Sequence, residues 1–446
     1  MEYISIFSKF ILDYICPFLN VSFDDNNYEI DIRYSNGNRS VDYESKSNQL
    51  LFWSCLRKGD ITVILLNYNK NPDIAYLREI ISYFISNINN LDKIEDSDIL
   101  DKALELLFQK GLCRWFHRNH YELINRLINK LSYWENQTNE GEKIDYCIGI
   151  KDCFNKGPKV NFLEFVDNKY SSVFSNQYNS IIQIDKEGNL IDNFFLNSGQ
   201  TLTGDIDNPS FLQMPSVFAP IIALSERKGS FITFILTKQG DLLVFKRKRI
   251  IAIKRKGNWQ VINFSIFAGS LVNVRCNDNK IFNMNQLKIF NSILNISISY
   301  VGGCLGFVSH EKILGELDML INPIDRLDII ETDQQLNSKC QLPIADFKKK
   351  IKKRKVLLKL INGKKFYELP SLLLIELLQL DGALILDENS NIITAGCILQ
   401  KITIGSCGGG RSAAALQLSL YGVGIKISED GDITVNDNTV KVYCLK

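Results

Sequence analysis

Three glycines run directly into a predicted helix near the end of the chain, and they form a candidate anion-binding site. The run is Gly408-Gly409-Gly410, followed by Arg411, Ser412 and a row of alanines. Residues without a Cβ atom let backbone N–H groups approach a phosphate, and the first turn of a helix adds unpaired donors and a positive dipole end. Arg411 adds a planar guanidinium that suits phosphate oxygens. The same glycines are equally typical of an ordinary flexible loop.

Short apolar runs separated by turns surround these glycines and predict the strands that position them. Runs at 384–386 and 392–399 flank a polar turn, and a strand at 423–428 leads through a hairpin turn into another at 433–435. The predicted helix lies between the second and third of these strands. Asp381-Gly382-Ala383 stands directly before the first strand. Asp-Gly is a common turn pair, so Asp381 taken alone is typical of a turn residue.

Four motifs in this order resemble the diadenylate cyclase (DAC) family. That family carries D-G-A at the start of one strand and G-x-R-H-R-x-A at the start of a helix. Asp381-Gly382-Ala383 matches the first motif, and the segment 409–415 aligns with the second without a gap. Ser428 and Glu429 match an S-E pair, and the strand at 301–308, with Gly302 and Gly303, matches one that flanks the adenine pocket. The resemblance covers the C-terminal part of the chain and is an argument by analogy.

The resemblance implies a nucleotide-binding domain that joins two ATP molecules into cyclic di-AMP. In active members two domains face each other, and each ribose 3′ hydroxyl attacks the α-phosphate of the opposing ATP, which requires a divalent metal. It thus implies Mg²⁺ or Mn²⁺ and a homo-oligomer. By position, Asp381 and Glu429 would be the catalytic and metal-binding carboxylates. The nucleotide-binding positions would be Gly302, Gly303, Gly382, Ala383, Gly408, Gly409, Gly410, Arg411, Ser412 and Ser428.

The chain departs from the family pattern where Ser412 and Ala413 replace the histidine and the second arginine. This removes one or two charge-assisted contacts, each worth about 1.5–3 kcal/mol. Lys401 and the basic segment 348–355 are candidates to replace the lost charge. The alternative function is a catalytically inactive sensor of a nucleotide or cyclic dinucleotide in bacterial signalling or defence. A nucleic-acid adaptor that uses the basic runs is a third hypothesis.

Length and composition indicate a globular protein of more than one domain. The chain has 446 residues and a formal net charge of +2, which gives no reason to expect nucleic acid as its general partner. Its 11 cysteines stand mostly alone in apolar runs, as expected for reduced, buried thiols in the cytoplasm. The N-terminal apolar run contains Ser8, Lys9 and Asp13, so it is too short and too charged to span a bilayer. We expect a cytoplasmic protein without a transmembrane segment.

Periodicity predicts an α+β protein, α/β in its C-terminal part, with three regions. Residues 1–150 are expected to be mostly helical, with strands at 28–34 and 61–66. Residues 160–275 alternate with period two and predict three hairpins, a β-rich module of sensor or adaptor type. By the resemblance, residues 286–446 are expected to form the DAC-like domain, a mixed sheet flanked by helices, with a loop expected at 318–337. In the first region, helices are expected from Asp73, from Ile99 to an end at Gly111, and from Tyr121.

Three other polar clusters have two interpretations each. Lys246-Arg247-Lys248-Arg249 and Lys254-Arg255-Lys256, with Trp259 nearby, suit either a solvated hairpin or a phosphate-binding surface. The segment 348–355 favours an exposed helix face over a nucleic-acid patch. His117 and His120 are three residues apart, but no Cys or acidic pair accompanies them, which disfavours a metal site.

Overall fold

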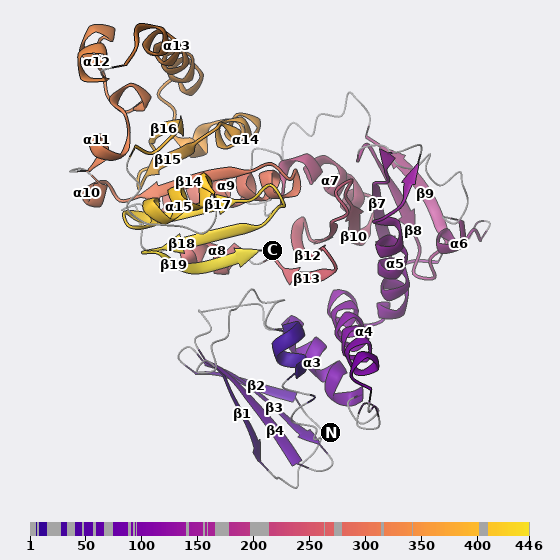
Figure 1. The fold of residues 1–446 in the computed structure, drawn as a ribbon. Helices are drawn as coiled ribbons and strands as arrows, with labels where there is room; N and C mark the ends of the chain where they lie inside the picture. The colour runs from indigo at the N-terminus through magenta and orange to yellow at the C-terminus, as the bar shows by residue number, and fades with distance from the viewer. Residues whose placement is uncertain are drawn as a thin grey trace. The chain divides into compact units, whose positions relative to one another are not determined.

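The computed structural model divides the chain into two compact units, which are described separately (Figure 1). Unit 1 comprises residues 1–200 and 221–266, and unit 2 comprises residues 201–220 and 267–446. The structure describes residues 6, 9–15, 28–33, 41–46, 49–56, 59–66, 75–87, 91, 94, 96–139, 142–154, 157, 159–165, 178–196, 214–262, 264–271, 279–313, 316–340, 342–400 and 409–445. Strands and helices occur in both units, so the α+β class expected from the sequence is confirmed.

The N-terminal part of unit 1 contains a π-helical turn, η1 (Ile11–Ile15), and a four-stranded antiparallel sheet. The strands follow the order β1-β4-β3-β2. Their bounds are β1 (Tyr28–Arg33), β2 (Val41–Lys46), β3 (Gln49–Leu56) and β4 (Gly59–Leu66). The two strands expected at 28–34 and 61–66 are therefore confirmed as β1 and β4, whereas β2 and β3 were not predicted.

Three helices follow, α3 (Ala75–Asn87), α4 (Ser97–Phe116) and α5 (Tyr121–Trp134). The prediction that the second helix ends at Gly111 is wrong, because α4 continues through it. A Cβ atom at Gly111 would lie 2.9 Å from Cα of Ile80, so the glycine allows α4 to approach α3 closely. Between α4 and α5, Gln109 donates from Nε2 to Oδ1 of Asn125 over 2.8 Å. This glycine therefore serves helix packing rather than helix termination.

A seven-stranded sheet forms the rest of unit 1 in the order β13-β12-β11-β10-β7-β8-β9. Only the β7–β8 pair is parallel. The bounds are β7 (Tyr146–Lys151), β8 (Ser180–Ile184), β9 (Leu190–Phe195), β10 (Ser230–Leu236), β11 (Leu242–Lys246), β12 (Arg249–Arg255) and β13 (Asn258–Val261). The three predicted hairpins are confirmed as β8–β9, β10–β11 and β12–β13. β7 lies between two of them, although its residues fall in the region expected to be mostly helical.

Short elements accompany this sheet, and α4 and α5 cover part of it. The remaining elements of unit 1 are β5 (Thr138–Asn139), β6 (Glu142–Lys143), α6 (Phe162–Phe165) and most of α7 (Ala219–Arg227), whereas η5 (Ser216–Phe218) belongs to unit 2. Phe116 of α4 contacts Trp259 of β13 at 5.9 Å between ring centroids, and Trp134 of α5 contacts Tyr146 of β7 at 4.7 Å. These side chains belong to one buried apolar cluster, so the helices and the sheet share a core.

Unit 2 is built on a six-stranded mixed sheet in the order β16-β15-β14-β17-β18-β19. β14 and β15 are parallel, and the other neighbours are antiparallel. The strands are β14 (Gly303–Val308), β15 (Ala383–Asp387), β16 (Ile392–Cys397), β17 (Gly422–Ile427), β18 (Ile433–Asp437) and β19 (Val440–Leu445). The helices are α8 (Phe264–Ser270), α9 (Asn279–Ile298), α10 (His310–Ile313), α11 (Leu317–Leu320), α12 (Asp333–Cys340), α13 (Ile344–Ile361), α14 (Ser371–Gln379) and α15 (Gly410–Ser419), with 3-10 turns η6 (Pro323–Asp325) and η7 (Phe366–Glu368).

Helices cover both faces of this sheet. Successive strand residues point to opposite faces. Gly303 packs near Ile296 of α9 and Leu378 of α14, whereas its neighbour Cys304 belongs to a buried cluster with Ala415 of α15. α9 and α14 therefore lie on one face and α15 on the other. The mixed sheet flanked by helices that was expected from the sequence is confirmed.

The connection between β14 and β15 is helical where a loop was expected. The expectation of a loop at 318–337 is wrong in part, because α11, η6 and the start of α12 fall in it. Asn322 caps η6 by accepting from the backbone N–H of Ile324. Thr332 and Gln335 cap α12 reciprocally, with Thr332 N–H donating to Oε1 of Gln335 over 2.9 Å. This Thr-x-x-Gln capping box was visible in the sequence.

Candidate functional site

Three strand ends of unit 2 bring the predicted site residues to one end of the sheet. Leu305 of β14 pairs with Leu384 of the parallel β15, and Gly303 pairs with Ile427 of the antiparallel β17. The beginnings of β14 and β15 and the end of β17 consequently coincide. Gly302, Gly303, Asp381, Gly382, Ala383, Ser428 and Glu429 all lie at or beside these three ends.

The first turn of α15 reaches the same sheet end. α15 is antiparallel to β17, because α15 ends at Ser419 and β17 begins at Gly422 and packs along it. Nη1 of Arg411 forms an ion pair with Oε1 of Glu429 at 2.7 Å. A Cβ atom at Gly302 would lie 2.0 Å from the same Nη1, so Gly302 leaves the space that the guanidinium occupies. Gly302 therefore lies beside Arg411 and Glu429 in space, although Glu429 follows it by 127 positions in the sequence.

Asp381 is exposed at the turn into β15, and its neighbour Gly382 requires glycine. Gly382 has a φ of +106°, and a Cβ atom there would lie 2.5 Å from the carbonyl oxygen of Cys397. The turn is thus pressed against the end of β16, with the Asp381 carboxylate left at the surface. This position suits Asp381 both as a turn residue and as a residue of the candidate site.

A cation that sequence reasoning did not single out stands beside this turn. Nζ of Lys353, from α13, donates to the carbonyl oxygen of Gly396 over 2.6 Å. A Cβ atom at Gly396 would lie 3.0 Å from that Nζ and 3.1 Å from the carbonyl oxygen of Asp381. The ammonium group therefore lies close to the Asp381 backbone. The basic character of 348–355 was visible in the sequence, but which lysine turns toward the sheet was not.

The other predicted site residues differ in their solvent exposure. Gly409 and Gly410 are exposed, and no atom lies within 4 Å of the Cβ position of either. Ser412 and Ser428 are half-buried, whereas Gly303 and Ala383 are buried in the sheet. Gly408 and Lys401 lie outside the described residues. The open backbone of Gly409 and Gly410 is thus the accessible part of the glycine run.

Two buried thiols lie beneath this end of the sheet. Cys304 of β14 and Cys397 of β16 flank Ala383, which pairs directly with Cys397. Burial raises the pKa of each thiol to about 12, against a smaller lowering at Cys304 from Arg411. Both cysteines are therefore protonated at neutral pH and are not nucleophiles. They agree with the expectation of reduced, buried thiols.

The two histidines of the sequence motif form a stacked pair in unit 1. The rings of His117 and His120 lie 4.4 Å apart, and Nε2 of His120 lies 3.3 Å from Oδ1 of Asp152. Burial, and then the neighbouring His120, lower the pKa of His117. Within the described residues no three His, Cys, Asp or Glu side chains are grouped to hold a metal ion. The pair is explained by packing in unit 1.

Several cations of the basic runs 246–249 and 254–256 make contacts within unit 1. Lys246 donates from Nζ to the carbonyl oxygen of Phe116 over 2.9 Å, and Lys254 donates to Oγ of Ser132 over 3.0 Å. Arg255 is 1% exposed and pairs with Asp241 at 2.7 Å, while Trp259 is 6% exposed. Only part of the run, including Arg247 and Arg249, is exposed. The phosphate-binding interpretation therefore loses Arg255 and Trp259 to the core, and Lys246 and Lys254 are engaged in hydrogen bonds within unit 1.

Comparisons with known proteins add little to this geometry. No protein-family model matches the chain, and no curated protein matches it. Among solved structures, a crystal structure of a double mutant of DacA from Staphylococcus aureus aligns with a TM-score of 0.23 and 14% sequence identity, over 38% of this chain and 91% of that chain. A TM-score of this size supports no argument about the fold or activity of this chain. No helix in the described part of the chain is long and apolar enough to cross a bilayer.

Proposed function

We propose that unit 2 is a diadenylate-cyclase-like nucleotide-binding domain, which joins two ATP molecules into cyclic di-AMP. The observation that carries the proposal is the convergence at one sheet end of Arg411 and Glu429, joined at 2.7 Å, with the turn that presents Asp381. The motifs that resemble the family are thus neighbours in space as well as in order. Random short matches, distributed over the chain, have no reason to converge in this way.

Phosphate binding falls to the first turn of α15. The amides of Gly409 and Gly410 lie at an exposed helix start without a side-chain cap. Arg411 is half-exposed beside them, so its guanidinium has access to a phosphate as well as to Glu429. The Ser412 hydroxyl is in the same turn. Unpaired amides and a guanidinium together suit the α- and β-phosphates of a nucleotide.

A divalent cation, Mg²⁺ or Mn²⁺, fits the chemistry of the acidic residues. Asp381 and Glu429 are exposed carboxylates at the same sheet end. Mg²⁺ is commonly held by one or two carboxylates together with substrate phosphates and water, so two protein ligands suffice. When bound, the cation neutralises charge at the α-phosphate and lowers the pKa of the attacking hydroxyl. Asp381 is proposed to orient that ribose hydroxyl.

The reaction needs two copies of the domain. The 3′ oxygen of one ATP forms a bond to the α-phosphorus of the other, the bond from that phosphorus to the bridging oxygen breaks, and pyrophosphate leaves with its electron pair. The hydroxyl proton passes to solvent or to a carboxylate. Two such transfers close the ring and release two pyrophosphates. The proposal therefore includes a homo-oligomer in which two sheet ends face each other.

Loss of the Asp381 carboxylate is expected to abolish product while leaving the fold intact. Purified full-length chain, incubated with ATP and Mn²⁺ or Mg²⁺, is assayed for cyclic dinucleotide by chromatography. Asp381→Asn should reduce the rate by about 100-fold or more, because a metal-binding or hydroxyl-orienting group is removed. Asp346→Asn, which alters an exposed acid on α13, is the matched control. Equal rates for Asp381→Asn and the wild type would refute the catalytic role.

Lys353 is proposed to supply part of the positive charge that Ser412 and Ala413 lack. Its ammonium group lies beside the Asp381 turn, and glutamine at this position replaces the charged group with a neutral amide donor on a side chain one atom shorter. We expect Lys353→Gln to weaken ATP binding about tenfold, since one charge-assisted contact is lost. Isothermal titration with ATP measures this, and Lys352→Gln, an exposed neighbour, should bind as the wild type does. Unchanged affinity in Lys353→Gln would assign the lysine to packing.

A second candidate function is a catalytically inactive sensor of a nucleotide or cyclic dinucleotide. The specific observation in its favour is that Glu429 already neutralises Arg411, while the two following positions are Ser412 and Ala413. In the same assay, a sensor binds ATP or cyclic di-AMP in titrations but forms no product. Absence of nucleotide binding would refute both functions.

A further inference from the structure

Helix α13 divides its basic run into an inner and an outer side. On the inner side, Lys350 pairs with Asp325 at 2.6 Å and Lys353 donates to the Gly396 carbonyl. Arg354 is 6% exposed and donates to the carbonyl oxygens of Arg326 and Ile329 over 3.0 and 2.6 Å. These three cations fasten the helix to unit 2.

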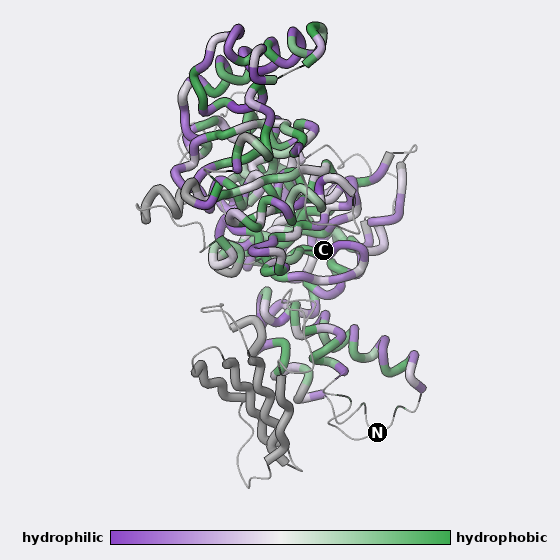
Figure 2. Tube along the Cα trace, turned by 60° about the vertical axis from the view of Figure 1, so that its left-hand side comes forward, coloured by the Kyte–Doolittle hydropathy of each residue, from purple (hydrophilic) through white to green (hydrophobic). Residues whose placement is uncertain are grey.

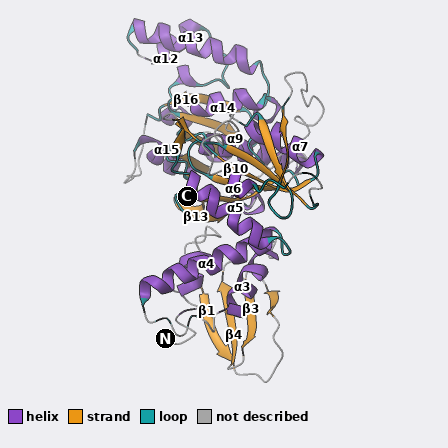
Figure 3. Ribbon diagram, turned by 90° about the vertical axis from the view of Figure 1, so that its right-hand side faces the viewer, coloured by secondary structure: helices purple, strands orange, loops and turns teal. Residues whose placement is uncertain are grey.

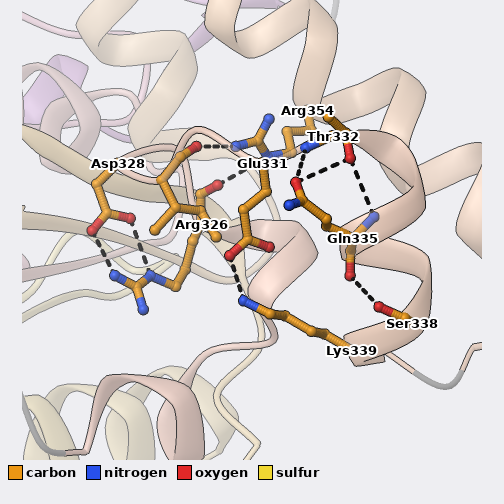
Figure 4. Close-up of polar contacts among 9 residues, drawn as sticks. Arg326, Asp328, Glu331, Thr332, Gln335, Ser338, Lys339 and Arg354 are labelled. Atoms are coloured by element: carbon orange, nitrogen blue, oxygen red, sulfur yellow. Dashed lines mark hydrogen bonds and ion pairs between the residues drawn. The ribbon is translucent and has the colours of Figure 1, made fainter.

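The segment beneath α13 is well fixed by further polar contacts, which Figure 4 shows around Arg354. Arg326, whose carbonyl oxygen accepts from Arg354, forms a two-pronged pair with Asp328, with Nη2 2.8 Å from Oδ2. Lys339 of α12 pairs with Glu331. These contacts define which side of α13 packs against unit 2 and which side faces outward.

The outer side presents a lysine stripe. Lys348, Lys352, Lys355 and Lys359 are spaced by four, three and four residues, so they share one helix face, and all are exposed. Lys349 is exposed beside them. Lys355 pairs with Asp333, whereas no ion pair within the described residues involves the other four. We call these five lysines the outer lysine face.

Aliphatic side chains border the outer lysine face. Ile344, Val356 and Leu360 of α13 are 75%, 51% and 50% exposed. Val356 and Leu360 are four residues apart and therefore adjacent on the helix. Figure 2 shows hydrophilic and hydrophobic residues succeeding one another along α12 and α13, and Figures 1 and 3 show both helices standing out from the six-stranded sheet. This surface combines charge with exposed hydrocarbon.

We propose that the outer lysine face docks unit 2 on an anionic lipid bilayer. Helical clusters of four to eight cations attract anionic headgroups, with each cation near the surface contributing about 1 kcal/mol. Flanking aliphatic residues can enter the interface, where hydrocarbon burial adds to the electrostatic attraction. Asp346 is the one exposed acid on α13, so the face keeps a net positive charge.

Lipid fits this composition better than nucleic acid does. The exposed residues of α13 include no arginine and no aromatic side chain. Binding of single strands relies on aromatic stacking, and recognition of bases relies strongly on arginine. Lysine offers a point charge that is indifferent to geometry, as suits a fluid array of headgroups. The attachment is peripheral and does not depend on the nucleotide site.

Co-sedimentation of the full-length chain with vesicles tests this proposal. Vesicles containing phosphatidylglycerol should retain the protein, pure phosphatidylcholine vesicles should not, and added salt should release it. The triple variant Lys348→Gln, Lys352→Gln, Lys359→Gln should partition about 100-fold more weakly. Its control removes three exposed lysines elsewhere, Lys102→Gln, Lys312→Gln and Lys441→Gln, and should bind as the wild type does.

A second variant separates a bilayer from other polyanions. Val356→Ser with Leu360→Ser keeps every charge, so it should weaken vesicle binding several-fold while leaving binding to soluble polyphosphate unchanged. Circular dichroism verifies that each variant is folded. The proposal is overturned if the wild type ignores the anionic vesicles, if the control triple loses as much binding as the test triple, or if double-stranded DNA displaces the protein from vesicles and binds it more tightly.

Discussion

Replacing Arg255 with methionine should destabilise unit 1 by about 4 kcal/mol, because it leaves the buried Asp241 carboxylate without its cation. Arg255 and Asp241 are each 1% exposed. The guanidinium donates from Nε to Oδ1 and Oδ2 of Asp241 over 3.1 and 3.0 Å and from Nη2 to Oδ2 over 2.7 Å. Methionine fills similar space but removes the cation that faces Asp241. The remaining carboxylate would have to be protonated or hydrated for the protein to fold.

Urea denaturation followed by tryptophan fluorescence measures this loss. All four tryptophans of the chain, Trp53, Trp115, Trp134 and Trp259, belong to unit 1 and report its unfolding. Arg249→Met removes an exposed cation from the start of the same strand and should change the free energy of unfolding by less than about 0.5 kcal/mol.

The double variant Arg255→Met with Asp241→Leu provides a second check. A buried ion pair exchanged for apolar residues is often neutral in stability, so the double variant should be more stable than Arg255→Met alone. If Arg255→Met unfolded within about 1 kcal/mol of the wild type, the buried pair would have no structural importance.

Gly424→Ala should destabilise unit 2 by about 3 kcal/mol, because the added methyl group meets the backbone of a helix. A Cβ atom at Gly424 would lie 1.7 Å from the carbonyl oxygen of Ala415 and 2.6 Å from its carbonyl carbon. Backbone atoms cannot turn aside as a flexible side chain can. α15 would have to move away from β17, and Arg411 would move with it. We therefore expect nucleotide binding to weaken along with stability.

Two other glycines provide graded controls for this prediction. Gly306 pairs with Gly424 across β14 and β17, but its Cβ atom would meet the Leu418 side chain at 2.9 Å, so Gly306→Ala should cost about 1 kcal/mol. Gly269 in α8 has no atom within 4 Å of its Cβ position, so Gly269→Ala should not destabilise.

Hydrogen exchange of the β17 and α15 amides reads out this series, because unit 2 contains no tryptophan. We expect the exchange rate of these amides to be lowest in Gly269→Ala, higher in Gly306→Ala and highest in Gly424→Ala. An undisturbed exchange pattern in Gly424→Ala would show that α15 can shift at little cost.

Local pattern was sufficient for most elements of the fold. Alternating apolar residues predicted the hairpins β8–β9, β10–β11 and β12–β13. Short apolar runs separated by turn residues predicted β15 to β18, and the glycine run predicted the start of α15. These features depend on residues near one another in the chain. The helix end at Gly111 was predicted wrongly because the contact of this glycine with Ile80 of α3 depends on the tertiary structure, whereas the start of α12 carries a local capping box and could have been predicted.

The sequence by itself determined the three hairpins of unit 1, the strands β14 to β18 of unit 2, the α+β class, and the order of the motifs around Asp381 and the glycine run. Only the tertiary structure decided that Arg411 meets Glu429, that Lys353 and not Lys352 turns toward the Asp381 turn, and that Arg255 is buried while Arg249 is exposed. The physical reason is that periodicity and turn chemistry act over a few residues. Burial, ion pairing and close glycine contacts depend on which distant segments the packing of the sheets brings together.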